Sequence, residues 1–525
     1  MEIFPILLTL VSILVAASVF VRLHRRPTKN RREVPLAAGA WPVIGHLLFY
    51  DSKTPTHATF GDMSVVYGPV FATKLGSYTS IIISSQEIAK EIYTVHDKFL
   101  DRPGLTASKL LGYDDSFLTF KPYGPQWREM RKIAATELLS SIRVDMQSHY
   151  RAGEADVSFG NLWKLWESKG RAKNGVLVDM KREFQDLTAN TSLMMVVGKR
   201  YFGDSPNCEK EEAMERRKLV RDFLDFFSLY LFSDFLPALG WTEWRVKRDM
   251  KRAAKELDVV LEELIAEHKN KKKHDLGLGE IKKTYLDLLM DTFEHTEIPG
   301  LDARTTTKAL CLNLILAGSE TAIVVLVWAV SLLVNNPHVI KKAQEELDNI
   351  VGKNRVVEES DIKDLVYIQA IVKETFRLYP PVPLVAFRHV LDDFDVANGT
   401  YHVPAGSLLL VNAWKIQRDP SLWSDPERFE PERFLTVDND VDVGGQSFKL
   451  FPFGLGRRSC PAIPLGLRMV HYALARFLHS FEVAKPSIEE DMDMTESNGL
   501  VNLKATPLEV MVTPRLDPHL YQFNM

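Results

Sequence analysis

Residues 451–466, "FPFGLGRRSCPAIPLG", combine one cysteine with glycines, prolines and two adjacent arginines. The whole chain has 525 residues but only three cysteines, and none of them forms a C-x-x-C pair. This usage excludes a disulfide framework and a cysteine-rich zinc site, and it indicates a reducing compartment for the catalytic part. The place of Cys460 in a Gly/Pro-rich loop therefore needs another explanation.

Three interpretations of this loop are open. A lone cysteine is commonly a buried structural residue. A phosphate-binding loop is disfavoured, because the pattern lacks the lysine of a Walker loop and no strand leads convincingly into it. In the third interpretation Cys460 is a thiolate ligand, which needs amide donors, small residues beside a flat cofactor, and a cation for the cofactor's carboxylates. Gly454, Gly456 and Arg458 supply these features.

The loop resembles the haem-ligand signature F-x-x-G-x-R-x-C of the cytochrome P-450 haem-thiolate monooxygenases, with matches at Phe453, Gly456, Arg458 and Cys460. The resemblance implies that Cys460 is the axial ligand of the haem iron and that Arg458 is a propionate partner. Gly456 is then a bend that lets the backbone approach the haem. Ala462 replaces the family's usual glycine, which is expected to tighten the packing slightly.

Two further motifs of the family occur in the expected order. "KETFR" supplies Glu374 and Arg377, which share a helix face because they are three residues apart. Further along, "PERF" supplies Arg433. The resemblance implies a buried triad that steadies the haem-side core, in which any unpaired member would carry a heavy desolvation cost.

More propionate partners are implied by the same resemblance. "WREMR" carries Trp127 and Arg131 in the W-x-x-x-R pattern that the family uses to hold a haem propionate, and Arg388 is the expected haem-side arginine. Phe387 stands where a proline is common in the family, so the ceiling of the pocket is expected to differ from that of close relatives.

Residues 305–336 form a long apolar segment that resembles a membrane span in length. Glu320 at its centre would cost about 2.5 to 3.5 kcal/mol in mid-bilayer, so a buried core helix lining a cavity is the better prediction. Gly318 and Ser319 are expected to let this helix bulge beside a ligand.

The same segment contains "AGSET", residues 317–321, which matches the oxygen-activating A-G-x-E-T segment of the family. The resemblance implies that Glu320 and Thr321 are an acid–alcohol pair that delivers protons, a task for which a carboxylate behind a hydroxyl is suited. Ala322 stands where a second Thr or Ser is frequent, but the matching alcohol, Thr321, is present.

Residues 3–21 are apolar except for one threonine and two serines. A helix of this length spans about 30 Å, which is one bilayer core. A cleaved signal peptide is the alternative, but its basic residues precede the apolar run, whereas here they follow it. We expect residues 1–21 to be a single transmembrane anchor in the endoplasmic reticulum, 22–47 a basic and Pro/Gly-rich linker, and 48–525 the cytosolic haem-thiolate catalytic domain.

The body is expected to be mainly α with a small β region, in the P-450 fold of a long central helix over the haem and a cysteine loop beneath it. Apolar spacing predicts helices at 251–269 and 336–350, and strands at 69–75, 80–85, 400–414 and 508–514. The basic run 269–274 is expected to be a solvated loop, and the aromatic segment 223–244 a hairpin in the lipid interface.

The formal net charge of -4 supplies no overall field for nucleic acid. The resemblance implies haem b as cofactor, and O2 and NADPH as co-substrates through a separate NADPH–cytochrome P-450 reductase, since no flavin domain is recognisable. Arg128, Lys132 and Arg457 are candidates for the reductase docking patch, with a merely solvated basic surface as an equal alternative.

By position in the family, the substrate pocket is lined by residues 105–120, 313–319, 382–387 and 499–501. These are mostly apolar, which suits a flat or terpenoid-like molecule, although plain core packing would have the same composition. The segment "VNAWKIQRDPSLWSDPERFEPERF" resembles plant microsomal enzymes of the group with flavone hydroxylases, nicotine demethylases and benzylisoquinoline-alkaloid hydroxylases.

The sequence thus predicts a membrane-bound monooxygenase that inserts one oxygen atom from O2 into a small lipophilic flavonoid, alkaloid, terpenoid or quinone. The alternatives are an isomerase or dehydratase of the same fold, and a non-catalytic membrane haem-binding protein. The isomerases often lack the relay alcohol, and a haem-binding protein needs neither Glu320 nor Thr321, so the presence of both residues favours the monooxygenase.

Overall fold

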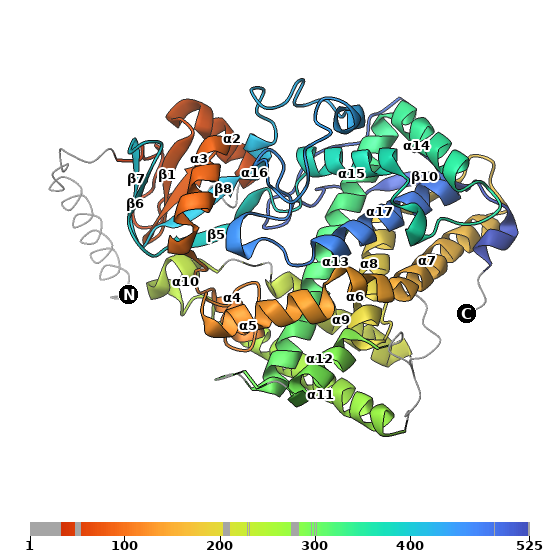
Figure 1. Ribbon diagram of the computed structural model, residues 1–525, viewed down its shortest axis with the longest axis horizontal. Coiled ribbons are helices and arrows are strands. Elements are labelled where there is room, and N and C mark those ends of the chain that lie inside the picture. Colours follow the sequence, from red (N-terminus) through yellow and green to blue (C-terminus); the bar gives the residue numbers. More distant parts are fainter. Residues whose placement is uncertain are drawn as a thin grey trace, which may run out of the picture.

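The computed structural model describes residues 33–47, 54–202, 210–227, 229, 231–274, 283–295, 297–298, 300, 302–487 and 489–522. The expected anchor, the first part of the expected linker and Cys208 lie outside these residues. Figure 1 shows a β-rich part at one end of the molecule and a larger helical part at the other, as expected for a mainly α chain with a small β region.

Helices make up most of the structure. The longer ones are α2 (Thr56–Tyr67), α5 (Pro125–Ile133), α7 (Ser148–Ser168), α8 (Met180–Val197), α9 (Lys210–Phe227), α11 (Trp244–His274), α12 (Tyr285–His295), α13 (Ala303–Asn335), α14 (Pro337–Ile350), α15 (Val366–Leu378) and α17 (Ile463–Ser480). The shorter ones are α3 (Gln86–Glu91), α4 (Thr106–Leu111), α6 (Ser141–Met146), α10 (Phe232–Phe235) and α16 (Ala413–Ile416).

The two helices predicted from apolar spacing are confirmed in α11 and α14. The loop predicted at 269–274 is wrong, because α11 continues through these residues to His274. Lysine is a good helix former, and no glycine or proline interrupts the chain before Gly277. The charge run therefore extends the helix instead of ending it.

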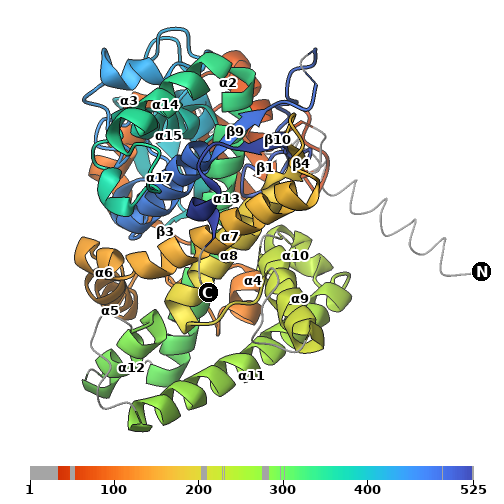
Figure 2. The same ribbon diagram turned by 90° about the vertical axis from the view of Figure 1, so that its right-hand side faces the viewer.

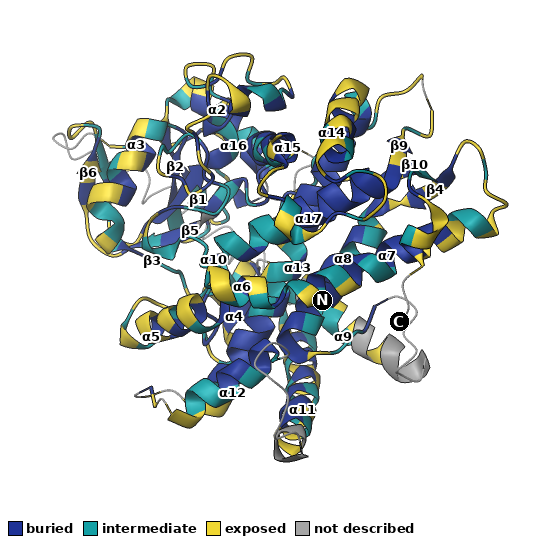
Figure 3. Ribbon diagram, turned by 45° about the vertical axis from the view of Figure 1, so that its right-hand side comes forward, coloured by how far each residue is buried: buried dark blue, intermediate teal, exposed yellow. Residues whose placement is uncertain are grey.

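Helix α13 runs through the centre of the molecule (Figures 1 and 3). Asp302 caps its first turn by accepting a hydrogen bond from the Thr305 amide. Among the described residues it is the one helix long and apolar enough to cross a membrane, but 67% of its most apolar window is buried inside the protein. The predicted core helix is confirmed.

The bulge expected at Gly318 and Ser319 is wrong, because α13 is helical without interruption. Gly318 serves a different purpose: a Cβ at this position would lie 2.9 Å from the Ser192 Oγ of α8. The missing side chain lets the two helices approach closely.

The β-rich part is a five-stranded sheet in the order β1-β2-β8-β5-β3, in which β2 and β8 are parallel and the other pairs antiparallel. Its strands are β1 (Val70–Leu75), β2 (Tyr78–Ile83), β3 (Leu100–Asp101), β5 (Leu384–Val390) and β8 (Leu408–Asn412). A second sheet joins β4 (Val176–Asp179), β10 (Glu509–Pro514) and β9 (Phe481–Ala484), and β6 (Phe394–Val396) pairs with β7 (Tyr401–Val403). Three predicted strand segments, 69–75, 80–85 and 508–514, are confirmed by β1, β2 and β10. The fourth, 400–414, holds two strands, β7 and β8, and its last two residues begin helix α16.

Candidate active site

The cysteine loop lies between the short turn η9 (Gly456–Arg458) and helix α17. The Cys460 amide donates to Phe453 O at 2.8 Å, which closes the loop, and the Ala462 amide donates to Cys460 Sγ at 3.3 Å. Loss of water raises the pKa of the Cys460 thiol above its ordinary value, and the Ala462 amide and the charge of Arg131 offset only part of this rise. An amide donor and a cation that favour a thiolate are therefore in place.

Gly456 has φ +69°, so the expected bend is present. A Cβ at this position would lie 2.6 Å from Asp97 Oδ1 and 2.7 Å from Tyr93 Cδ1. The close approach that requires glycine is therefore to these two residues. Ala462 has φ -100°, a conformation open to any L-residue, so the departure at this position causes no backbone strain.

A group of buried arginines lies beside this loop. Arg388 on β5 is 2% exposed, and its Nη1 has no hydrogen-bond partner among the described residues. Arg458 donates to Asp101 Oδ1 at 2.6 Å, and loss of water together with the charge of Arg388 lowers its pKa to about 10 despite Asp101. For the half-buried Arg131, no acidic partner is found in the described part of the chain. Asp101 is thus the one described carboxylate beside the three arginines Arg388, Arg458 and Arg131. The excess positive charge of this cluster would be balanced by an anionic ligand.

Trp127 on α5 holds two of these arginines in place. Its ring lies 5.7 Å from the Arg131 guanidinium and 4.7 Å from that of Arg458. The indole Nε1 donates to Leu118 O at 3.0 Å, so this N–H is already bonded to the backbone. The geometry makes Trp127 a cation–π platform for the arginines.

The centre of α13 has one accessible face. Ala317 and Thr321, one turn apart, are exposed although the helix runs through the core, and Thr321 Oγ1 donates to Ala317 O at 2.8 Å. Glu320 beside them is partly buried, and loss of water together with the charge of Asp225 raises its pKa, against the effect of Lys181. A carboxyl group with a raised pKa therefore comes directly before, in the sequence, a hydroxyl on an accessible helix face.

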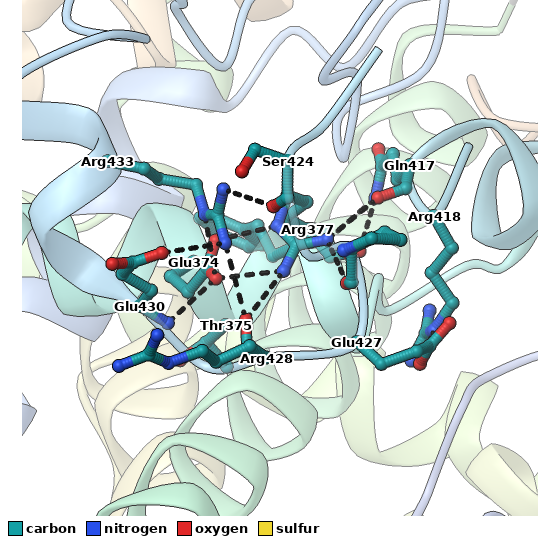
Figure 4. A network of polar contacts seen from close by, with 12 residues as sticks. Glu374, Thr375, Arg377, Gln417, Arg418, Ser424, Glu427, Arg428, Glu430 and Arg433 are labelled. Atoms are coloured by element: carbon teal, nitrogen blue, oxygen red, sulfur yellow. Dashed lines mark hydrogen bonds and ion pairs between the residues drawn. The ribbon is translucent and has the colours of Figure 1, made fainter. Parts of the chain in front are cut away.

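The structure brings together Glu374, Arg377 and Arg433, as Figure 4 shows. Arg377 donates to both carboxylate oxygens of Glu374, at 2.7 and 2.8 Å, and Arg433 Nε donates to Glu374 Oε1 at 3.1 Å. All three side chains are at most 2% exposed. The paired charges and several backbone carbonyls that accept from the two arginines offset the cost of burial.

Gln417, which the sequence motifs do not include, connects this triad to the cysteine loop. Its backbone oxygen accepts from Arg377 Nη1 at 3.0 Å, and its Oε1 accepts from the Phe451 amide at 3.2 Å. The start of the cysteine loop is therefore tied to the buried triad.

Comparison with known proteins decides the family. A family model described as cytochrome P450 matches residues 35–512. The chain belongs to the cytochrome P-450 family. It is 45% identical to strychnine-10-hydroxylase of Strychnos nux-vomica, over 93% of this chain and 92% of that protein, and 44% identical to a xanthotoxin 5-hydroxylase of Arabidopsis thaliana, over 96% and 97%. A zebrafish P-450 structure with progesterone has a TM-score of 0.71 at 22% identity and covers 88% of this chain and all of that chain, which supports the fold.

This protein is therefore a P-450 monooxygenase that resembles plant enzymes, and the family implies haem b, O2, NADPH through a reductase, and a lipophilic substrate. Haem, when bound, supplies the iron at which dioxygen is reduced. The residues fit it, because Arg388, whose Nη1 has no partner among the described residues, and the cluster around Arg458 suit the two propionates. The Cys460 sulfur with its amide donor suits the iron.

Contacts link two of the segments expected to line the substrate pocket of the P-450, and join residues next to the other two. Thr119 and Asn313 bond reciprocally, since Asn313 Nδ2 donates to Thr119 Oγ1 at 2.9 Å. Asn502, next to residues 499–501, donates its amide to Pro381 O at 2.9 Å. Phe387 is 5% exposed and packs against Phe235 at 6.1 Å, within the core beside the five-stranded sheet.

Of the three docking candidates, Arg128 and Lys132 are exposed on α5. Arg457 is committed to other contacts, because its Nε donates to Asp97 Oδ2 at 2.9 Å and its guanidinium lies 4.2 Å from the Tyr123 ring. Asp97, Asp101 and Gln417 were not found from the sequence, since each pairs with a residue far along the chain and belongs to no local motif.

Proposed function

We propose that this P-450 oxygenates a small, rigid, multi-ring plant metabolite. The observation that carries the proposal is the similarity along more than nine tenths of the chain to enzymes whose names specify strychnine and xanthotoxin. Apolar pocket segments support it, because the polar pair Thr119 and Asn313 is satisfied internally and leaves mostly apolar surface for a substrate.

In this proposal Cys460 is the axial ligand of the haem iron. Arg388, Arg458 and Arg131 hold the propionates, while Trp127 positions the last two of them. Phe453 and Gly456 shape the loop: Phe453 O accepts the Cys460 amide, and the Phe453 ring packs edge-on against Phe376 of α15 at 5.4 Å.

Thr321 and Glu320 are proposed to hold and pass protons to the oxygen that is lost as water. The Thr321 hydroxyl must turn away from Ala317 O to bond with a substrate-side water, and loss of water raises the pKa of Glu320, which favours the protonated carboxyl that a proton donor needs. The triad of Glu374, Arg377 and Arg433 is proposed to fix the loop through Gln417 and takes no part in proton transfer.

The test uses microsomes that contain the full chain and a plant reductase, with NADPH and air, offered strychnine, xanthotoxin, flavonoids, terpenoids and quinones one at a time. A product heavier by one oxygen atom, or a demethylated or ring-closed product, supports the proposal. Turnover that needs neither NADPH nor O2 would instead indicate an isomerase of this fold.

We further propose that the protein is a single-pass membrane protein of the endoplasmic reticulum, with anchor 1–21, linker 22–47 and cytosolic catalytic domain 48–525. Support comes from exposed aromatic residues that follow α9: Phe232 is 52%, Trp241 74% and Trp244 54% exposed. The linker approaches the same place, because Ile44 O accepts from the Gly76 amide at 3.1 Å and Phe235 O accepts from the Ser77 amide at 3.0 Å. Exposed aromatic side chains are typical of a membrane interface.

A further inference from the structure

Residues 495–505 form a short hairpin between β9 and β10, which we call the C-terminal hairpin. Glu496 bridges Lys504, the Ser497 amide donates to Leu503 O at 2.8 Å, and the Ala505 amide donates to Thr495 O at 2.9 Å. Its tip carries residues 499–501, which are expected to line the pocket. So few backbone bonds do not fix the direction of the tip, and side chains must do so.

A buried contact between a histidine and a carboxylate holds one side of the hairpin. Glu496 Oε2 lies 2.6 Å from His57 Nε2, and Glu496 Oε1 accepts from Trp414 Nε1 at 3.1 Å. The His57 residue is 2% exposed. Loss of water raises the pKa of Glu496, but the hydrogen bond and charge of His57 and the charge of Arg418 together bring it below its ordinary value. The carboxylate is therefore held as an anion with two donors.

A second contact joins the C-terminal hairpin to α2, the helix that carries His57. Asn498 Oδ1 accepts from the amide of Thr56 at 3.3 Å and from its Oγ1 at 2.9 Å. Pro55, at the N-cap of α2, provides no side-chain cap, so Asn498 satisfies a free amide of the first turn from outside the helix. His57 O in turn accepts from Asn412 Nδ2 at 2.8 Å, which fixes α2 to β8.

The other side of the hairpin is attached to the central helix. Trp328 Nε1 donates to Asn502 O at 2.7 Å, and the fully buried Trp328 ring stacks on Tyr379 with centroids 3.9 Å apart. Trp328 lies on α13 two turns beyond Thr321. Glu496 and Asn498 thus bond one side of the C-terminal hairpin to α2, and Asn502 bonds the other side to α13.

We propose that His57 and Glu496 are positioning residues that hold the tip 499–501 against the pocket and thereby determine which ligands and substrate positions the enzyme accepts. The inference rests on the proposed function in one respect, that the tip lines the pocket above the haem. Neither residue needs to touch substrate: a shift of about 1 Å in a lining segment can cost about 100-fold in rate.

The experiment measures ligand binding to haem-loaded, full-length protein by the shift of the Soret band. The probes are imidazole, which reaches only the iron, and 4-phenylimidazole, whose ring also occupies the pocket. The variants are His57→Phe, Glu496→Gln and the double variant, with His338→Phe as matched control because His338 is exposed on α14. We expect His57→Phe to weaken the binding of 4-phenylimidazole about tenfold and to leave the binding of imidazole unchanged.

The double variant should bind 4-phenylimidazole no more weakly than His57→Phe, since Glu496→Gln removes the buried carboxylate that His57→Phe leaves without its imidazole partner. Thr56→Val removes only the 2.9 Å bond to Asn498 and should weaken the binding of 4-phenylimidazole by a smaller factor. It replaces His57→Phe in the test if that variant does not fold. If His57→Phe weakens the binding of both probes equally, or does not weaken the binding of 4-phenylimidazole, the proposal is overturned. Failure of the wild type to give the carbon-monoxide band of a thiolate-ligated haem would contradict the proposed function instead.

Discussion

At the scale of single residues, the surroundings distinguish the two described cysteines. Cys311 on α13 is fully buried, and loss of water together with the charge of Asp287 raises its pKa to about 12. Loss of water raises the pKa of Cys460 as well, but this thiol accepts an amide hydrogen bond from Ala462 and lies near the charge of Arg131, and both of these lower it. The same thiol group is therefore an inert part of the core in one place and a candidate iron ligand in the other.

Replacing the candidate ligand tests this distinction. Cys460→Ser should remove the strongly red-shifted Soret band of the reduced, carbon-monoxide-bound protein, because a hydroxyl does not supply the thiolate. Cys311→Ala should retain the band, although the cavity it creates lowers stability. A red-shifted band in folded, haem-loaded Cys460→Ser protein would disprove the assignment.

The accessible face of α13 gives a second prediction at this scale. Thr321→Ala should raise NADPH consumption per molecule of product, because a positioned proton donor contributes about 10² to 10⁴-fold to proton-transfer steps. The matched control is Thr307→Ala, since Thr307 Oγ1 also donates to the carbonyl four residues earlier, Ala303 O at 2.9 Å, but lies nearly four turns away. Equal coupling in wild type and Thr321→Ala would exclude the proposed role.

At the scale of elements, the cysteine loop contains two glycines with similar backbone angles and different neighbours. Gly454 has φ +76° and Gly456 has φ +69°. A Cβ on Gly454 would meet nothing within 4 Å, whereas one on Gly456 would collide with Asp97 and Tyr93. Gly454→Ala should lower the free energy of unfolding by about 1 kcal/mol from backbone strain alone. Gly456→Ala should cost more and reduce haem content, measured by denaturant unfolding and the haem-to-protein absorbance ratio; equal costs would contradict the steric explanation.

The elements also show what could be predicted from the sequence. The long helices and the motifs were predictable, because apolar spacing and fixed offsets are local patterns. The bulge at Gly318 was predicted from Gly and Ser alone, but the approach of Ser192 from α8 explains the glycine without any bulge. Likewise, Asp101 accepts from Arg458, which is hundreds of positions away in the sequence, and Gln417 accepts from Arg377, which is tens of positions away. Only the folded chain brings these residues together.

At the scale of the whole molecule, stability should depend on pH through a buried histidine. Loss of water, with smaller effects of Lys373 and Arg468, lowers the pKa of His471 on α17 to about 4. Near pH 7 the residue is neutral in both states. As pH falls from about 6.5 to 4, the unfolded chain binds a proton that the folded protein does not, so stability falls by about 3 kcal/mol in total. His471→Gln should flatten this part of the pH profile of urea unfolding, and His338→Gln on the surface should not.

The membrane proposal makes a prediction about how the whole molecule is oriented. In full-length protein embedded in phosphatidylcholine nanodiscs, brominated acyl chains should quench tryptophan fluorescence, because Trp241 and Trp244 are exposed beside the segment that continues the linker. The double change Trp241→Phe and Trp244→Phe should remove a large part of this quenching. Trp166→Phe is the control, because α7 and α10 lie towards opposite ends of the long axis in Figure 1, and Figure 2 looks at the molecule from the α7 side. If the double variant is quenched as strongly as the wild type while Trp166→Phe is not, the face presented to the membrane is the one that carries α7, and the catalytic domain is turned the other way.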